Sequence, residues 1–511
     1  MENKRIRKHM KSNFIKLSDK VKIRKEYFGG VLFNMDTGDV IDIDREAFTV
    51  ISIIKHIELV DMNALLDMPI TYKGKRINSG GIKGILSRFA DMGIIDVMPN
   101  GILSEDYRKR LQEKNLIKLR WPAYEHLSAP ETVHWAVTYK CGEACPDCYI
   151  ERHKSLFTNE LDTQAAYNLI SKIADSGVFQ LAIGGGEPLI RNDLEDIVHR
   201  ASEKGLAVHI TTGKYEIERE RLDALAKHIK TLQIGIRTDE LINGDISAAE
   251  KLRVLITQLN ERGIIAGANL IMTRSSIHNF DRVIEMLISS GFKRYTLLRY
   301  KPPKNVKRWL QEKPNKHDLD LLEERLTVMQ EMHTDILFRI DCALSFLERR
   351  LNPQTALYSG IRGCVAGDRI ISVAPDGSVY PCSQLVGDIF KAGNLLNEDF
   401  ECIWNRSNVV KKYRSFREKK CFKNSSCGKC QAKVFCGGCR VFAEDAIGSD
   451  PGCPGPLCGS NYTDDEYDVI ADIQDTIGCT DAGFPYATRE EIEKWLEEDN
   501  NKDYPSWINN R

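Results

Sequence analysis

The chain has 511 residues, 42% of them hydrophobic, and a formal net charge of −1, which predicts about two to four domains with a sizeable apolar core. The near-neutral charge excludes a protein that coats nucleic acid, because such proteins carry a strong basic excess. No apolar run reaches the roughly 18 residues of a membrane span, and the basic stretch Lys4–Lys25 is not followed by the apolar region of a secretory signal.

We therefore expect a cytoplasmic protein with no nucleic-acid and no membrane partner. The stretch Lys4–Lys25 is interpreted as a solvated terminus, with contact to a charged partner as the alternative.

The first part of the chain, residues 1–112, is predicted to form a separate small α+β module. A hairpin is expected at Glu26–Phe33 and Asp39–Ile43, around the turn at residues 36–38. Three helices are expected next, at Arg45–Lys55, Val60–Leu66 and Gly81–Met92. A second hairpin follows, formed by the strands Ile94–Val97 and Gly101–Ser104. This order is typical of a winged-helix domain, and residues 113–130 are expected to be a linker.

From Thr132 onward, short β-rich runs alternate with amphipathic helices. The predicted strands are Thr132–Thr138, Phe179–Ile183, Ala207–Thr211, Thr231–Ile236, Ile264–Met272 and Arg294–Leu298. The predicted helices include Asp162–Asp175, Asp193–Lys204, Ser247–Glu261 and Phe280–Ser289. Such repeats build a parallel sheet through right-handed crossovers. We expect an α/β fold, a partial (β/α)6 TIM-like barrel over residues 131–345, with functional residues at the C-terminal strand ends.

Fifteen cysteines are the strongest chemical signal, because a reducing compartment disfavours disulfides and favours thiolate ligands. Cys141, Cys145 and Cys148 follow the first predicted barrel strand directly. Three thiolates in one short loop can hold three irons of a cubic cluster and leave the fourth iron open. A zinc site is the alternative, but it usually needs a fourth ligand at a matching spacing.

A glycine-rich segment, Gly184-Gly185-Gly186-Glu187-Pro188, ends the second predicted strand. Glycines allow a ligand to approach the backbone closely, and a glutamate can pair with an ammonium group. The alternative is a tight strand-to-helix turn capped by Glu187.

Together, the cysteine loop and this segment resemble the radical S-adenosylmethionine (SAM) superfamily. The resemblance implies that Cys141, Cys145 and Cys148 ligate a [4Fe–4S] cluster and act in catalysis. It also implies a cofactor-binding set, which comprises Gly185, Gly186, Glu187, Thr211, Thr212 and Tyr149. Two positions depart from the family pattern: Asp147 replaces an aromatic residue, and Gly235–Asp239 lacks the usual ribose contact at the fourth strand end.

Cysteines are dense again in residues 346–465, which are expected to fold around metal. Taken alone, Cys427–Cys439 also fits a zinc knuckle. The whole array, with the hairpin Pro375–Cys382, resembles the SPASM domain, which binds two further [4Fe–4S] clusters. The resemblance implies Cys364, Cys382 and Cys439 as ligands of one auxiliary cluster. It implies Cys427, Cys430, Cys436 and a downstream cysteine as ligands of the other.

The sequence leaves three ligand positions open. The downstream ligand is either Cys453 or Cys458. Cys342 is either a fourth ligand of the first auxiliary cluster or a small buried hydrophobic residue. Cys436 and Cys439 are separated by two residues, where the family usually has three. Residues 466–511 are expected to form an acidic, partly helical tail.

These resemblances predict an enzyme that cleaves SAM to a 5′-deoxyadenosyl radical and modifies a ribosomally synthesised precursor peptide. The module around Glu26–Phe33 looks like a leader-peptide recognition element; DNA binding or a purely structural role are the alternatives. The expected product is a thioether between a Cys sulfur and a carbon. Carbon–carbon or carbon–oxygen crosslinks, epimerisation, tetrapyrrole modification and sulfatase maturation stay open.

The expected cofactors are three [4Fe–4S] clusters and SAM, and the expected electron donor is a flavodoxin or ferredoxin. The alternative outside enzymes is a zinc-binding winged-helix regulator.

Overall fold

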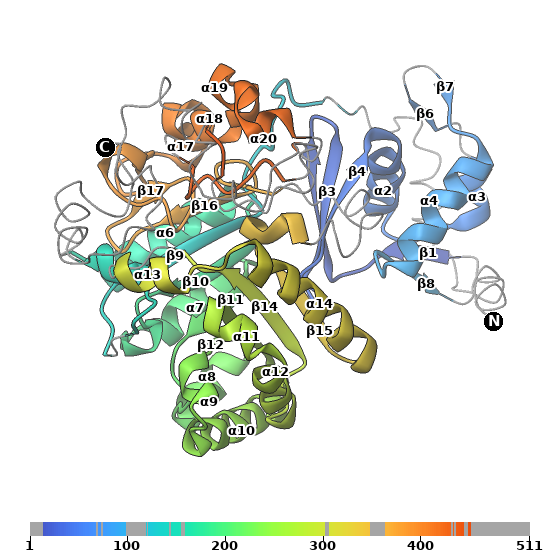
Figure 1. The fold of residues 1–511 in the computed structure, drawn as a ribbon. Coiled ribbons are helices and arrows are strands. Elements are labelled where there is room, and N and C mark those ends of the chain that lie inside the picture. Colours follow the sequence, from blue (N-terminus) through green and yellow to red (C-terminus); the bar gives the residue numbers. More distant parts are fainter. Residues whose placement is uncertain are drawn as a thin grey trace. The chain divides into compact units, whose positions relative to one another are not determined.

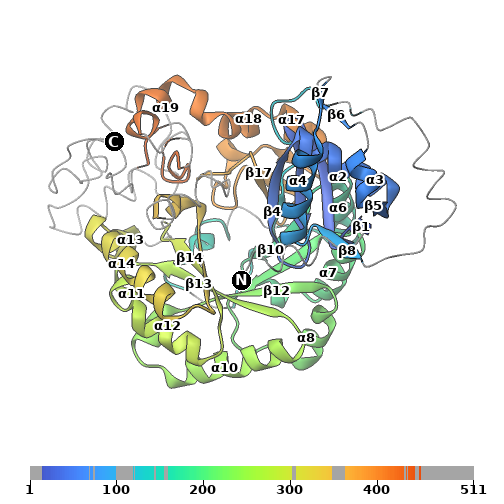
Figure 2. The same cartoon turned by 90° about the vertical axis from the view of Figure 1, so that its right-hand side faces the viewer.

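The computed structural model describes residues 14–67, 70–72, 75–98, 119, 121–142, 145–154, 159–301, 306–347, 363–430, 433, 436–443 and 448–450. The chain divides into two compact units, Met1–Ser128 and Ala129–Arg511. Figures 1 and 2 label many of the helices and strands of both units.

The N-terminal unit contains two small antiparallel sheets and a β-ribbon. The first sheet has the order β2-β3-β4, formed by Val21–Glu26, Gly29–Asn34 and Val40–Asp44. The second has the order β5-β1-β8, formed by Val60–Asp61, Phe14–Leu17 and Ile95–Met98. The ribbon pairs β6 (Thr71–Tyr72) with β7 (Lys75–Arg76).

Three helices complete this unit: α2 (Arg45–Ile57), α3 (Met62–Asp67) and α4 (Ser79–Asp91). Asp44 caps α2 by accepting a hydrogen bond from Ala47 N at 2.8 Å, which fits the preference of Asp for helix N-caps. The apolar faces of α2 and α4 enter one hydrophobic core, in which Val50, Ile54 and Leu86 are buried. The side chains of this core all come from the range of residues 15–97, and Leu119 and Trp121 pack against them.

The structure corrects several sequence predictions in this unit. The stretch Glu26–Phe33 is not one strand, because Glu26 ends β2 and Gly29 begins β3. The described part of Lys4–Lys25 is not a solvated terminus: it forms β1 and β2, whose apolar side chains enter the core. β8 pairs with β1, and Gly101–Ser104, its predicted hairpin partner, lies outside the described residues.

The second unit is built on a ten-stranded sheet of order β15-β14-β13-β12-β11-β10-β9-β16-β17-β18. Its seven barrel strands are β9 (Thr132–Thr138), β10 (Gln180–Gly185), β11 (Ala207–Thr212), β12 (Ile229–Gly235), β13 (Ile265–Met272), β14 (Arg294–Arg299) and β15 (Leu337–Ile340). Neighbours from β9 to β15 are parallel. The predicted parallel α/β sheet is therefore confirmed, as an open sheet with β15 at one edge.

Helices follow these strands and lie on the outer face of the curved sheet (Figure 2). They are α6 (Thr163–Asp175), α7 (Leu194–Glu203), α8 (Arg219–Ala226), α9 (Thr238–Ile242), α10 (Ile246–Glu261), α11 (Arg274–His278), α12 (Phe280–Ser289), α13 (Val306–Glu312) and α14 (Lys316–Met332). The four helices named from the sequence agree with α6, α7, α10 and α12 to within one residue at each end. Caps explain this agreement: Asp162, for example, accepts from Ala165 N at 2.8 Å.

The C-terminal region extends the same sheet through β16 (Ile370–Val373), β17 (Ser378–Tyr380) and β18 (Gly393–Asn394). β16 pairs parallel with β9, and β17 and β18 follow antiparallel. Four short helices come next, coloured orange in Figure 1: α17 (Phe400–Arg406), α18 (Asn408–Arg414), α19 (Lys420–Asn424) and α20 (Ser426–Lys429). The predicted tail, residues 466–511, lies outside the described residues.

Candidate functional site: two cysteine regions at the strand ends

The first cysteine loop leaves the C-terminal end of β9. Cys148 N donates to Cys145 O at 3.1 Å, and Cys148 then begins the short helix η1 (Tyr149–Arg152). Burial raises the pKa of Cys148, while the amides of Ile150 and Glu151 bind its sulfur and lower it. The Cys141 thiol also raises this pKa. The two thiols therefore interact electrostatically within the loop.

The glycine-rich segment packs on the backbone that leads into this loop. Gly186 N donates to Thr138 O at 2.8 Å, and Glu187 N donates to Lys140 O at 2.9 Å. A Cβ atom on Gly186 would lie 2.2 Å from Lys140 O. Gly185 adopts a φ of 114°, in the region where glycine is favoured. The glycines thus bring β10 into direct contact with the residues just before Cys141.

Glu187 joins two of the segments that were predicted to bind the cofactor. Its buried carboxylate accepts hydrogen bonds from Thr212 Oγ1 at 2.9 Å, Gly213 N at 2.9 Å and Leu189 N at 3.0 Å. Thr212 is buried and directed at Glu187, whereas Thr211 is exposed. The strand ends of β10 and β11 are therefore linked beside the cysteine loop, and the cofactor roles of these residues stay predictions.

Tyr149 points toward the second cysteine region. Burial raises its pKa to about 12, with the Cys148 and Cys382 thiols adding to the rise. Ser383 forms a hydrogen bond to its hydroxyl and Lys301 acts on it electrostatically, and both lower the pKa. Tyr149 therefore lies between the first cysteine loop and Cys382, while its predicted cofactor contact stays untested.

Asp147 is held in a network that the sequence did not reveal. Its carboxylate accepts from Tyr300 Oη at 2.5 Å and from Arg308 Nε at 2.7 Å. Arg308 also donates to Asp239 at 2.7 Å. Asp147 and the segment Gly235–Asp239 are the two departures from the family pattern, and one guanidinium on α13 connects Asp147 with Asp239. Charge-assisted bonds of this kind are stronger than neutral ones, so the network stabilises the cysteine loop.

Four cysteines of the second region converge at the ends of β14 and β15. Cys342 follows β15 and begins η4 (Cys342–Leu344). Burial raises its pKa strongly, and the thiols of Cys364 and Cys439 raise it further. Burial also raises the pKa of Cys382 to about 11, and the Cys364 thiol contributes to that shift. Cys342 thus belongs with the predicted ligands of the first auxiliary cluster, although those ligand roles stay predictions.

The second predicted ligand set surrounds α20. Cys427 and Cys430 are buried, and Cys436 is partly buried. Two backbone amides donate to sulfur: Asp450 N to Cys427 Sγ at 3.2 Å and Gly438 N to Cys436 Sγ at 3.4 Å. Such N–H···S bonds are typical of cysteines that hold iron–sulfur clusters. Cys453 and Cys458 both lie outside the described residues.

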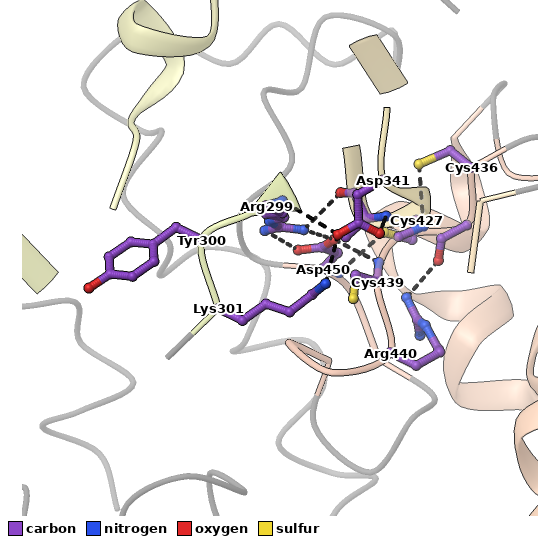
Figure 3. Close-up of polar contacts among 12 residues, drawn as sticks. Arg299, Tyr300, Lys301, Asp341, Cys427, Cys436, Cys439, Arg440 and Asp450 are labelled. Atoms are coloured by element: carbon purple, nitrogen blue, oxygen red, sulfur yellow. Dashed lines mark hydrogen bonds and ion pairs between the residues drawn. The ribbon is translucent and has the colours of Figure 1, made fainter. Parts of the chain in front are cut away.

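The short spacing between Cys436 and Cys439 has a local explanation. Gly437 and Gly438 both adopt positive φ values, 67° and 70°, which only glycine adopts readily. A Cβ on Gly438 would lie 2.5 Å from Asp450 Cβ and 3.1 Å from Cys427 Sγ. Two consecutive left-handed glycines therefore let the chain direct Cys439 away from Cys436 (Figure 3), while its assignment to the first auxiliary set stays a prediction.

Charged residues from the barrel surround these cysteines (Figure 3). Arg299, the last residue of β14, donates to Asp450 at 2.5 and 2.8 Å. The same carboxylate accepts from Cys439 N at 2.7 Å. Lys301 pairs with Asp341 at 2.7 Å. These four residues were given no role from the sequence, because each partner is 40 or 151 residues from the other.

The arrangement fits iron–sulfur clusters. Amides donate to sulfur in each of the two predicted ligand sets that include Cys148 and Cys427. Among the described residues, no three His, Cys, Asp or Glu side chains are close enough to hold a single metal ion. Within the same residues, every helix is too short or too polar to cross a bilayer.

Comparison with known protein families assigns both cysteine regions. Residues 135–300 match the radical SAM superfamily, and residues 364–431 match SPASM, an iron-sulfur cluster-binding domain. The chain therefore contains a radical SAM domain followed by a SPASM domain, which confirms the resemblance seen in the sequence. These two domains imply [4Fe–4S] clusters and SAM as cofactors.

Curated relatives include enzymes of two kinds. The AdoMet-dependent heme synthase of Nitratidesulfovibrio vulgaris is 25% identical over 347 residues, which cover 64% of this chain and 91% of the relative. The mycofactocin maturase MftC of Mycobacterium tuberculosis is 26% identical and covers 66% and 85%. The PqqA peptide cyclase of Ruegeria pomeroyi is 26% identical and covers 70% and 94%. The chain is thus related to peptide-modifying radical SAM/SPASM enzymes and to heme synthase.

Solved structures share the fold over most of the chain. Streptococcus suis SuiB bound to its precursor peptide SuiA matches with a TM-score of 0.59 and 18% identity, over 87% of this chain and 100% of SuiB. SuiB bound to S-adenosylmethionine matches with a TM-score of 0.56 over 86% of this chain and 95% of SuiB. At this level of identity, the likeness concerns the fold alone.

Proposed function

We propose that this chain is a peptide maturase that cleaves SAM at a [4Fe–4S] cluster held by Cys141, Cys145 and Cys148. The observation that carries the proposal is the packing of the Gly184–Glu187 segment on the backbone that enters the cysteine loop. When bound, the cluster and SAM supply the one-electron chemistry that removes a hydrogen atom from an unactivated carbon. The chain's own groups orient the cofactor and exclude water.

The proposed cofactor site uses the residues that the sequence singled out. Gly185 and Gly186 let this segment pack closely on the backbone that enters the cysteine loop, and Glu187 takes the ammonium group of the cofactor. Thr212 supports Glu187 through its hydroxyl at 2.9 Å, and Thr211 and Tyr149 complete the predicted set. The carboxylate of Glu187 is oriented by Thr212, Gly213 and Leu189, and a carboxylate can pair with an ammonium group.

Two auxiliary clusters are proposed for the SPASM region. Cys342, Cys364, Cys382 and Cys439 hold the first, a set supported by the mutual electrostatic effects of their thiols. Cys427, Cys430 and Cys436 hold the second together with Cys453 or Cys458. These clusters would accept the electron left on the substrate or bind a substrate thiolate, and a flavodoxin or ferredoxin would supply electrons from outside.

The proposed substrate is a ribosomally made precursor peptide, and the proposed product is a thioether between Cys sulfur and carbon. SuiB, whose structure includes a precursor peptide, shares the fold over 87% of this chain. Heme synthase supports tetrapyrrole modification as a second candidate, but that relative aligns with only 64% of the chain. Carbon–carbon and carbon–oxygen crosslinks remain alternative products.

The N-terminal unit is proposed to bind the peptide's leader. β2 and β4 are the outer strands of a three-stranded antiparallel sheet and pair, among the described residues, with β3 alone. An extended peptide can add to such an edge through backbone hydrogen bonds. The near-zero net charge of the chain supports this role over DNA binding.

The test is anaerobic reconstitution with iron and sulfide, followed by dithionite reduction in the presence of SAM. The wild-type protein is expected to bind about a dozen atoms each of iron and sulfide, as three cubic clusters require, and to release deoxyadenosine. The variant with Cys141, Cys145 and Cys148 changed to Ala is expected to lose about a third of the iron and all release. A colourless zinc protein, or equal release by both proteins, would disprove the proposal.

A further inference from the structure

Lys301 and Asp341 form a pair at the ends of two neighbouring strands of the second unit, β14 and β15. Lys301 comes two residues after the end of β14, and Asp341 directly follows β15. Their side chains are 13% and 11% exposed, and Lys301 Nζ lies 2.7 Å from Asp341 Oδ2. Asp341 also accepts a hydrogen bond from Ala343 N at 3.2 Å. The pair is therefore largely shielded from solvent, and Asp341 has a second hydrogen-bond partner besides the lysine.

The ammonium of Lys301 faces the proposed ligands of the first auxiliary cluster. In Figure 3 its side chain points toward Asp341 and Cys439. Asp341, which holds this ammonium at 2.7 Å, directly precedes Cys342 in the chain. Lys301 also interacts electrostatically with the thiols of Cys439, Cys382 and Cys342.

The carboxylate of Asp341 acts on the same thiols with the opposite sign. It interacts electrostatically with the thiols of Cys342 and Cys382, and it stays paired with the ammonium of Lys301 at 2.7 Å. The site therefore contains two opposed charges that are fixed beside one group of cysteines.

Fixed charges beside an iron–sulfur cluster change its reduction potential, because reduction adds a negative charge that a nearby cation stabilises and a nearby anion opposes. Interactions between charges are stronger in a buried site than in water. We infer that the Lys301–Asp341 pair sets the reduction potential of the first auxiliary cluster, with Lys301 raising the potential and Asp341 lowering it. The inference rests on the auxiliary cluster proposed above.

An electrostatic role and a purely structural role predict different directions for the shifts in reduction potential. If the pair served only to anchor η4 to β14, removing either partner would disturb the site in the same way. An electrostatic role requires that the two partners, substituted separately, shift the potential in opposite directions. The lysine is a positioning and tuning residue in this account, since it is not assigned to touch substrate or to ligate iron.

The experiment is an anaerobic redox titration monitored by electron paramagnetic resonance. It uses full-length protein in which Cys141, Cys145 and Cys148 are changed to Ala, so that only the auxiliary signals remain. Lys301→Met is expected to move one auxiliary midpoint potential to more negative values, and Asp341→Asn to move the same one to more positive values. The other auxiliary signal serves as an internal reference, and Lys301→Arg is expected to restore the original potential.

A matched control exists at the opposite end of the same two strands. Lys293 and Asp335 form a 3.1 Å pair whose side chains are 70% and 66% exposed. Lys293→Met and Asp335→Asn are expected to leave both midpoint potentials unchanged, because solvent screens that pair.

The outcomes separate this inference from the proposed function. Wild-type protein without auxiliary signals would disprove the proposed clusters. Auxiliary signals that shift in the same direction in Lys301→Met and Asp341→Asn, or do not shift, would overturn the tuning role alone. Loss of iron from both variants would also overturn it, because the pair would then be structural.

Discussion

At the scale of single residues, the Arg299–Asp450 pair makes the most consequential contact. Asp450 is 2% exposed, and its carboxylate bonds to Arg299 and to the amide of Cys439. Its own amide donates to Cys427. One residue thus connects a barrel strand with one cysteine of each proposed auxiliary set.

Arg299→Met is expected to lower the free energy of unfolding by about 3–5 kcal/mol, because it leaves a buried carboxylate without its cation. Iron content should fall with it, since Cys427 and Cys439 lose their support. Anaerobic urea denaturation and iron analysis measure both effects. The control is Arg325→Met, which removes an exposed pair with Asp281 and should cost at most about 1 kcal/mol. Equal losses in the two variants would contradict the prediction.

His209 makes stability depend on pH. Burial, with smaller effects of Arg339 and His134, lowers its pKa from 6.5 to about 4. Below pH 6.5 the unfolded chain therefore binds a proton that the folded chain excludes. The stabilisation is complete above pH 6.5 and is lost as the pH falls toward 4.

The wild-type protein is expected to lose about 1.4 kcal/mol from this group between about pH 7.5 and pH 5.5. His209→Gln should remove that part of the pH dependence, as judged from urea midpoints at both pH values. His317→Gln changes an exposed histidine of α14 and should keep the wild-type dependence. The same pH dependence in His209→Gln and the wild type would show that burial of His209 is not its cause.

At the scale of elements, two glycines at the end of β10 differ in the space around them, so that a substitution of one serves as the control for the other. Gly186→Ala would place a Cβ 2.2 Å from Lys140 O, whereas a Cβ on Gly184 has its nearest contact at 4.0 Å, to Thr211 Cβ. Gly186→Ala is therefore expected to shift the backbone that enters the cysteine loop. Gly184→Ala should fit without movement.

The expected result for Gly186→Ala is at least tenfold weaker SAM binding, about 1.4 kcal/mol, while Gly184→Ala should bind almost normally. Isothermal titration with SAM on the reconstituted protein measures the difference, and iron content shows whether the cluster is retained. Wild-type affinity in Gly186→Ala would mean that this close approach does not shape the cofactor site.

At the scale of the whole molecule, the N-terminal unit has a hydrophobic core of its own. All residues of that core lie between Ile15 and Trp121, and the second unit begins at Ala129. A variant that lacks residues 1–128 should therefore retain the second unit's fold. Because the N-terminal unit is proposed only to bind the leader, this variant should also retain SAM cleavage.

That variant is expected to release deoxyadenosine as the full chain does, but to modify its precursor at least tenfold more slowly, because leader binding is lost. Mass spectrometry of the peptide and chromatography of deoxyadenosine measure the two activities. The matched control is a leaderless precursor given to the full chain, which should react equally slowly. Fast modification by the truncated variant would contradict leader binding by this unit.

The sequence predicted the parallel sheet well because local patterns determine it. β9 agrees with its predicted bounds, and α12 does so as well, since buried strands and amphipathic helices differ in period and length. The cysteine motifs were equally visible, because short loops keep ligands close in sequence. These local features were sufficient to indicate the resemblance to both domain families.

The N-terminal unit was predicted less well, for a physical reason. β1 lies in a basic stretch, but it pairs with β8, about 80 residues later. β1 has only four residues, Phe14–Leu17, and they do not alternate between apolar and polar, so the basic residues around them dominated the prediction. Pairing between distant strands is decided by tertiary packing, which a local pattern does not contain.

By itself, the sequence determined the order of strands and helices and the groups of cysteines, because both depend on neighbours along the chain. The tertiary structure alone decided which charges meet those cysteines: Asp147 with Arg308, Lys301 with Asp341, and Arg299 with Asp450. Each pair joins segments 40 or more residues apart. Burial gives such pairs their strength, and burial exists only after the chain has folded.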